Sequence, residues 1–306
     1  MTTAPRAAAI PPTYLAAGYM IFAAALFASM HGTVRLVSAD LHPFVIAVFR
    51  NLFGFLALMP LLLRGGIELF KTTRFGMHTT RAVFNSISML MWFTALSLIP
   101  LADATALSLT GPLFVTLGAI VAFGERVRMW RWGALLFGAS GALLIIRPGF
   151  EEIQIGMLLT IGSAAFAGIS KLFAKSLTRT DDPTTIVAYL QFLMTLMTLV
   201  PALFYWEWPT LEQFGGLIVI GILGSLGHLF SVRAYAIADV SFAEPMVFTR
   251  MVWATLFGFI VFSEVPDAWT WAGASVIVSA TSIIAWRERR ERQAAKRAAG
   301  ESGGAK

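Results

Sequence analysis

Four ionisable residues in or beside long apolar stretches are the first candidates for chemistry in this chain. His228, Arg233 and Arg250 each lie within such a stretch, and Glu244 lies six residues before Arg250. Ionisable side chains inside a membrane are costly and mark functional sites by default. Arg250 is therefore the candidate for holding a substrate carboxylate through a charge-assisted hydrogen bond. His228 is the candidate for relaying a proton, since histidine titrates near neutrality.

Each of these residues also has a structural interpretation. Arg233 and Glu244 could pair between adjacent helices near the inner gate without touching substrate, as buried ion pairs often do. His228 could be a hydrogen-bonded packing residue. Arg35 and Lys171 lie near the ends of apolar stretches. Long basic side chains at such places usually reach the membrane surface, so neither is expected to contact substrate.

Aromatic and uncharged polar residues are the second set of candidates. Seven of the nine tryptophans lie at the ends of apolar stretches, as in an interfacial belt, whereas Trp92 and Trp253 lie inside. These two are expected to stack on an aromatic or apolar substrate, with packing or lipid contact as the alternative. Asn85, Thr110 and Thr249 are expected to orient the substrate. A threonine hydroxyl can instead bond to a carbonyl of its own helix.

Two dipeptides, Gly111-Pro112 and Glu244-Pro245, interrupt apolar stretches. Proline removes a backbone hydrogen bond and kinks a helix. Weakened helices at corresponding places in two repeats point to the substrate site and the moving parts of a transporter. These residues are therefore gating candidates, and a static kink is the alternative.

The elements that must position these residues are predicted to be membrane-spanning helices. Hydrophobic residues make up 57% of the 306 positions and charged residues 13%. A bilayer core about 30 Å thick needs about 20 apolar residues per helix. Ten such segments follow one another, at residues 13–37, 43–63, 78–99, 102–124, 129–147, 153–175, 183–206, 211–238, 241–263 and 267–286. The predicted fold is thus an all-α membrane protein with ten transmembrane helices.

The chain contains no cysteine, no phosphate-binding loop and no cluster with metal-ligand spacing. These absences indicate neither a cofactor nor a bound metal, and they exclude ATP as the energy source.

The basic residues predict the orientation of the helices. With the N-terminus inside, basic residues gather on the cytoplasmic side, and Arg147 is the only one in the outer loops. Both termini are therefore expected in the cytoplasm, at the inner membrane of a bacterium. Residues 288–306 form a basic tail that is predicted to be disordered. Because topology explains the net charge of +6, membrane lipids and not nucleic acid are the expected partners.

The second half of the chain repeats the first. Ala95–Ile146 aligns without a gap on Ala234–Ala285 at a shift of 139 residues, which pairs Glu125 with Glu264. Each unit has five predicted helices, and an odd number means that the second unit enters the membrane from the opposite side. The units are thus predicted to be inverted repeats around a central cavity, an arrangement that supports alternating access.

The segments Gly111–Val115, Ala122–Glu125 and Trp132–Ala134 resemble the signature region of the drug/metabolite transporter superfamily, and in particular its EamA family. The second copy, from Ala243 onward, resembles the pattern more loosely, with Ser263 in place of the usual glycine. Within the family, the chain is most similar to the YddG-type exporters of aromatic amino acids. The resemblance implies EamA repeats over residues 13–147 and 153–287, a cavity walled mainly by helices 1, 3, 4, 6, 8 and 9, and no cofactor.

These observations predict a secondary transporter that exports amino acids, aromatic and other neutral ones, by alternating access. A carrier of another small metabolite or of a cationic drug is the alternative within this class. A cationic substrate would need an unpaired carboxylate, and Glu244 is the one intramembrane candidate. An intramembrane enzyme acting on lipid is the alternative from another class, but the sequence contains no catalytic constellation for it.

Overall fold

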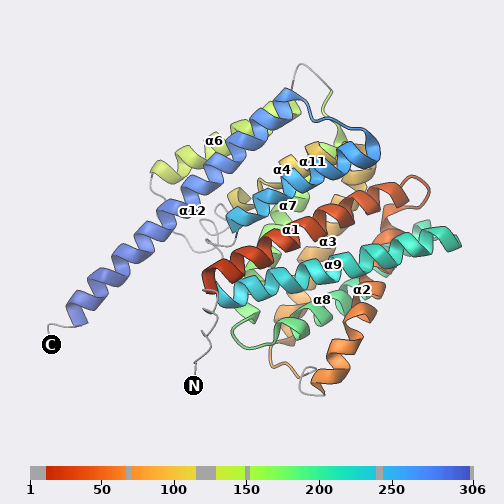
Figure 1. The fold of residues 1–306 in the computed structure, drawn as a ribbon, viewed down its shortest axis with the longest axis horizontal. Coiled ribbons are helices and arrows are strands. Elements are labelled where there is room, and N and C mark those ends of the chain that lie inside the picture. The colour runs from red at the N-terminus through yellow and green to blue at the C-terminus, as the bar shows by residue number, and fades with distance from the viewer. Residues whose placement is uncertain (1–11, 67–70, 115–128, 149–151, 239–243, 304–306) are drawn as a thin grey trace, which may run out of the picture.

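The chain forms a bundle of long helices (Figure 1). The computed structural model describes residues 12–66, 71–114, 129–148, 152–238 and 244–303. Within them lie ten α-helices: α1 (Pro12–Val37), α2 (Pro43–Gly65), α3 (Phe75–Leu98), α4 (Leu101–Ser108), α6 (Met129–Ile146), α7 (Ile155–Leu177), α8 (Pro183–Ala202), α9 (Leu211–Ile237), α11 (Thr249–Phe262) and α12 (Ala268–Gly303). Two short 3-10 helices, η2 (Leu203–Tyr205) and η3 (Glu244–Phe248), extend α8 and precede α11. The all-helical prediction is confirmed.

Six of the described helices are long and apolar enough to cross a membrane, namely α1, α2, α7, α8 together with η2, α9 and α12. Shorter apolar stretches lie in α6 (Trp132–Ile146) and in η3 with α11 (Met246–Phe262). In α3, the polar residues 78–81 lower the hydropathy of the first turns. Beyond α4, residues 109–114 of the fourth predicted segment are described, with a turn at 109–110 and helix at 111–114. Crossing of the membrane by all ten segments stays a prediction.

Two helices in equivalent places begin with the same kind of cap. His42 precedes Pro43 at the start of α2, and its Nδ1 accepts a hydrogen bond from the backbone N–H of Phe44. Asp182 precedes Pro183 at the start of α8 and accepts from Thr184 N at 2.7 Å. A capping side chain satisfies a free N–H, and proline is tolerated in the first turn because its missing N–H has no helical partner there.

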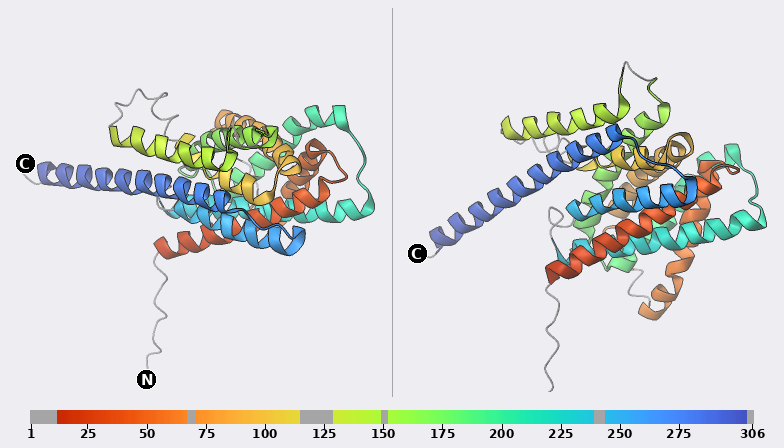
Figure 2. Two further views of the ribbon diagram at one scale, coloured as in Figure 1. Left: turned by 90° about the horizontal axis from the view of Figure 1, so that it is seen from above. Right: turned by 45° about the horizontal axis from the view of Figure 1, so that its top comes forward.

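The helices pack in pairs that follow the repeat. A shift of 139 residues places α1 on α7 and α3 on α9. The structure packs α1 against α9 and α3 against α7, so the two pairs exchange under this shift. The helices α2 and α8 pack on each other, as do α6 and α12, which run side by side in both views of Figure 2. This pattern is the one that a two-fold relation between the halves requires.

The C-terminal tail differs from the expectation. We expected disorder from residue 288, but α12 continues as a helix to Gly303 and projects beyond the bundle. Alanine, arginine, glutamate, lysine and one glutamine make up the tail from residue 288 to 299. These residues have high helix propensity, which explains why the preceding apolar helix is extended rather than broken.

Candidate substrate pocket

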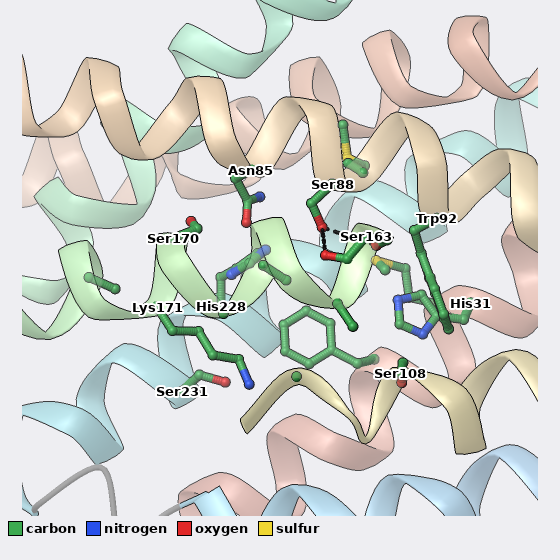
Figure 3. Close-up of a pocket in the computed structure, with 18 of the residues that line it drawn as sticks. His31, Asn85, Ser88, Trp92, Ser108, Ser163, Ser170, Lys171, His228 and Ser231 are labelled. Carbon is green, nitrogen blue, oxygen red and sulfur yellow. Dashed lines mark hydrogen bonds between the residues drawn. The ribbon is translucent and has the colours of Figure 1, made fainter. Parts of the chain in front are cut away.

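A pocket lies in the middle of the bundle, between α1, α3, α4, α7, α9 and α11 (Figure 3). These elements belong to the first, third, fourth, sixth, eighth and ninth predicted segments. Arg50 of α2 also reaches the pocket, as does Gly111 of the helical residues 111–114. All the long helices that line the pocket are apolar over most of their length, so the few polar side chains that face it determine what it can bind.

One end of the pocket is aromatic. The rings of His31 and Trp92 meet edge to face with their centroids 5.0 Å apart. Phe27 stacks on His31 at 6.2 Å and meets the His228 ring edge to face at 5.0 Å. The four rings form a continuous series from α9 across α1 to α3, which offers a flat ligand both faces and edges for contact.

Ser88, Ser108 and Ser163 lie toward Trp92 and His31, whereas the other end of the pocket carries two further hydroxyl groups. Ser170 of α7 and Ser231 of α9 line it beside Lys171, away from His31 and Trp92 (Figure 3). The shift of 139 residues places His31 on Ser170 and Trp92 on Ser231. Equivalent positions of the two repeats therefore carry rings at one end and hydroxyls at the other. The pocket therefore differs at these equivalent positions even though its helices are paired by the repeat.

The pocket is also positively charged. Its basic lining residues are Arg50, Arg81, Lys171 and Arg250, and its described lining contains no aspartate or glutamate. The Arg50 guanidinium donates to the neutral oxygens of Asn51 and Gln191, both at 2.6 Å. Arg81 donates to the backbone oxygen of Ile186 at 3.1 Å. These neutral oxygens do not cancel the charges of Arg50 and Arg81, so a cationic ligand is disfavoured beside these two residues.

Arg250, His228 and Asn85 line the pocket, as the sequence analysis expects of substrate-binding residues. Arg250 of α11 donates to Ser108 Oγ of α4 at 2.5 Å, which joins one helix of each half beside the pocket. Asn85 contacts the sulfur of Met194 through Nδ2 at 3.2 Å. Trp92 is buried at the aromatic end. The functional roles of these residues stay proposals.

Three expected substrate-binding residues are placed elsewhere. The hydroxyl of Thr110 donates to Leu107 O, and that of Thr249 donates to Met246 O, both at 2.7 Å. These hydroxyls satisfy carbonyls of their own turns, which is the alternative that the sequence left open. Trp253 is 39% exposed and does not line the pocket. Trp253 lies in the middle of an apolar stretch, but such a position does not show whether the side chain points into the bundle or out of it.

The helix interruptions lie close to the expected dipeptides. In the first repeat, α4 ends at Ser108 and helix resumes at Gly111, with a turn at residues 109–110 before Pro112. In the second, η3 begins at Glu244 and gives way to α11 at Thr249. The side chains of Glu244 and Pro245 lie outside the described residues, so the expected pair between Glu244 and Arg233 stays a prediction. Arg233 is half-buried and does not line the pocket.

Several lining residues were missed or misplaced by the sequence analysis, and four of them show why. His31, Ser88 and Ser163 were not singled out, although His31 is an ionisable residue inside an apolar stretch and carried the same signal as His228. Lys171 was expected at the membrane surface but lines the pocket. Serines give no signal in a sequence, because their side chains are common on membrane helices and bond to their own backbone.

The fold and the site define a helical membrane carrier with a central polar pocket and a duplicated chain. The profile of the EamA-like transporter family matches the chain twice, over residues 14–147 and 154–286. The protein therefore belongs to the EamA-like transporter family. It is a transporter of small metabolites and not an enzyme.

Curated relatives cover most of the chain. A riboflavin transporter of Vibrio cholerae is 32% identical over 90% of this chain and 94% of its own length. A pseudopaline exporter of Pseudomonas aeruginosa is 30% identical, over 85% and 92% of the two chains. An S-adenosylmethionine uptake transporter of Rickettsia bellii is 26% identical, over 84% and 88%. These names do not support the narrower resemblance to YddG-type amino-acid exporters.

One crystal structure superposes on this chain with a TM-score of 0.62 at 17% identity, over 91% of this chain and 98% of the other. At that identity, the likeness concerns the fold alone.

Proposed function

We propose that this protein carries a flavin-like metabolite, a flat heteroaromatic ring bearing a polyhydroxylated chain, across the bacterial inner membrane. The two ends of the pocket support this proposal. The rings of His31 and Trp92 lie at one end, and the hydroxyls of Ser170 and Ser231 lie at the other. A ligand with an aromatic ring and a polyol chain is complementary to both ends at once. The riboflavin transporters among the relatives agree with this choice.

The charge of the pocket supports a neutral or anionic substrate over a cationic one. Arg50 and Arg81 line it, and their printed hydrogen bonds go to neutral oxygens. The sulfonium of S-adenosylmethionine would meet these like charges in a medium that screens them poorly. A cationic drug is disfavoured for the same reason.

Transport by alternating access between two inverted five-helix halves is part of the proposal. The duplicated family match and the exchange of the α1–α9 and α3–α7 pairs support a two-fold relation between the halves. A carrier of this kind exposes a central site to each side in turn. The bias of basic residues supports cytoplasmic termini.

Flavin fluorescence provides the test. Proteoliposomes that contain the purified protein should take up riboflavin saturably, and tenfold excess tryptophan or S-adenosylmethionine should compete little. Binding of lumichrome, the same ring without the chain, should be compared with that of riboflavin. The double variant Ser170→Ala/Ser231→Ala should weaken the binding of riboflavin by about two- to tenfold per lost hydrogen bond. The binding of lumichrome should stay nearly unchanged.

The control is Ser140→Ala, because Ser140 is exposed on α6 and its hydroxyl bonds to Phe137 O of its own helix. This variant should bind both ligands like the wild type. Absence of saturable riboflavin binding by the wild type would overturn the proposed function.

An amino acid is the second candidate, and the place of Arg250 favours it. Its guanidinium lines the pocket next to Ser108 and could hold a carboxylate. The same titration with tryptophan and phenylalanine decides between the two. Tight amino-acid binding that Arg250→Gln weakens by about ten- to a hundredfold would replace flavin with this candidate.

A further inference from the structure

Two buried ring nitrogens at the aromatic end lack a hydrogen-bond partner among the described residues. His31 and Trp92 are 6% and 7% exposed, and both line the pocket. The atoms concerned are Nδ1 of His31 and Nε1 of Trp92. Their rings touch edge to face, yet the two nitrogens do not bond to each other. Since buried polar groups are almost always paired, unpaired ones on residues that line a pocket point to a ligand as their partner.

The two nitrogens differ in what they offer. The indole Nε1–H of Trp92 can only donate. A neutral imidazole has one donor nitrogen and one acceptor nitrogen, so Nδ1 of His31 can accept in the tautomer that carries the proton on Nε2. A donor and an acceptor side by side complement a ligand edge on which a carbonyl oxygen lies next to an N–H. That edge is the imide or cis-amide edge of a flat heterocycle.

The helix that carries Trp92, α3, is held in place close to this residue by a contact with α7. Ser88 of α3 donates to the backbone oxygen of Ser163 of α7 at 2.9 Å, and their hydroxyls lie 3.1 Å apart. Figure 3 shows this pair between Asn85 and Trp92 on the wall of the pocket. The contact joins α3 to α7, so the Trp92 nitrogen is presented on a preformed surface.

We propose that His31 and Trp92 together recognise the imide edge of the transported ring, and that this pair selects heterocycles with a free imide N–H. Trp92 Nε1–H donates to a ring carbonyl, and His31 Nδ1 accepts from the adjacent ring N–H. The inference rests on the proposed flavin function and adds to it the feature by which the ring is chosen. A site built to pair with a polar edge rejects analogues that leave its buried groups unpaired.

Methylation of the ring provides the first test, because it needs no protein variant. Riboflavin and N3-methylriboflavin differ only at the imide nitrogen. Their dissociation constants for the purified wild-type protein are measured by flavin fluorescence titration and checked by equilibrium dialysis. We expect N3-methylriboflavin to bind about tenfold more weakly or worse, the scale of one lost hydrogen bond with a buried partner left unpaired.

Two conservative variants separate hydrogen bonding from shape. His31→Phe keeps a ring but removes the acceptor. The binding of riboflavin should therefore weaken to that of N3-methylriboflavin, and the difference between the two dissociation constants should vanish. Trp92→Phe removes the donor, which both ligands use. The binding of both ligands should therefore weaken by a similar factor, and the ratio of their dissociation constants should stay the same. Trp253→Phe is the matched control outside the pocket, and it should change neither constant.

Each outcome is informative. If the wild type binds both flavins equally, the imide inference fails while the flavin function stands. If His31→Phe retains the discrimination, the methyl group was rejected by its size, and the proposed role of His31 is wrong. If the wild type binds neither flavin, both proposals fall together. A variant that does not fold leaves the comparison of the two ligands on the wild type as the deciding measurement.

Discussion

At the scale of single residues, Asp181 is the clearest structural anchor. It lies between α7 and α8, and its Oδ2 is 2.7 Å from both His78 Nε2 and Thr72 Oγ1. The side chains of His78 and Asp181 are 1% and 4% exposed. Burial raises the pKa of Asp181, but hydrogen bonds from His78, Thr72 and Thr180 lower it more, so it lies below its ordinary value. The carboxylate thus stabilises the fold in its charged form.

Asp181→Asn should therefore destabilise the protein. A hydrogen bond to a charged group contributes about 1.5–3 kcal/mol, which corresponds to a loss of roughly 3–10 °C in melting temperature for a chain of this size. Asp182→Asn is the matched control, because asparagine caps a helix as well as aspartate does and α8 should keep its start. Thermal unfolding of the detergent-solubilised proteins measures both.

The pH dependence of this effect has a definite sign. Because the pKa of Asp181 is lowered on folding, its stabilisation is fully present above the unfolded value of about 3.9 and is lost as the pH falls through the folded value. Below about pH 4, the difference in melting temperature between wild type and Asp181→Asn should therefore shrink. A difference that grows as the pH falls would contradict this account.

At the scale of helices, the interruptions show how far proline can be used as a predictor. The dipeptides Gly111-Pro112 and Glu244-Pro245 indicated that the fourth helix of each repeat is broken. The structure places the breaks at residues 109–110 and at the junction of η3 with α11. The shift of 139 residues relates these places, and in each a threonine hydroxyl donates to the carbonyl three residues earlier. A proline thus predicts that a helix is interrupted nearby, whereas the local hydrogen bonds determine the residue at which the interruption occurs.

The contact between α1 and α11 closes one end of the bundle. Arg35 of α1 pairs with Glu264 at the end of α11, and both of its terminal nitrogens lie 2.6 Å from carboxylate oxygens. The Arg35 guanidinium also lies 4.7 Å from the centre of the Phe262 ring. One turn before Arg35, Gly32 leaves the space that Phe257 fills. These contacts join the two repeats on the side away from Ser170 and Ser231.

Arg35→Gln should loosen this end of the bundle. The pair is partly exposed and is worth about 1 kcal/mol or less, so a shift of a few-fold in the equilibrium between open and closed forms is expected. A single cysteine at Ser163, which lines the pocket, should then react a few-fold faster with an impermeant maleimide applied from the Glu264 side.

Asp267→Asn is the control for this prediction. Asp267 pairs with Arg147, which joins the ends of α6 and α12, two helices that pack on each other directly. Removing that pair should leave the reaction rate of the cysteine at Ser163 unchanged. Equal rates in all three proteins would show that Arg35 and Glu264 do not hold the end closed.

At the scale of the whole molecule, the sequence predicted the helices and the repeat but not the faces of the helices. Apolar length and a gap-free internal match were enough for the first two. The helices of a membrane protein are apolar on all sides, since lipid and core are equally apolar, so periodicity does not show which side meets the pocket. This is why Thr110, Thr249 and Trp253 were expected in the pocket, while Ser88 and Ser163 were overlooked.

The repeat also explains how one scaffold obtains a selective site. Two copies of a five-helix unit supply equivalent walls, and substitutions at equivalent positions then make those walls different. His31 and Trp92 on one side correspond to Ser170 and Ser231 on the other. A symmetric pair of walls can thus present different side chains to the two ends of the proposed flavin-like ligand.

Equivalent positions on the surface test the inversion itself. Asp40 follows the first helix of the first repeat, Arg179 follows the first helix of the second, and both are exposed. The shift of 139 residues relates the two positions. Inverted repeats place them on opposite sides of the membrane, whereas parallel repeats would place them on the same side. The acidic residue on one and the basic residue on the other agree with Arg179 in the cytoplasm.

Because the chain contains no cysteine, single cysteines at these positions report their sides without a background. In intact cells, an impermeant maleimide should label Asp40→Cys and not Arg179→Cys, and permeabilisation should make both reactive. Labelling of both in intact cells would refute the inverted arrangement. Labelling of Arg179→Cys alone would keep the inversion and reverse the orientation, because the relation between the repeats is independent of the side on which the chain begins.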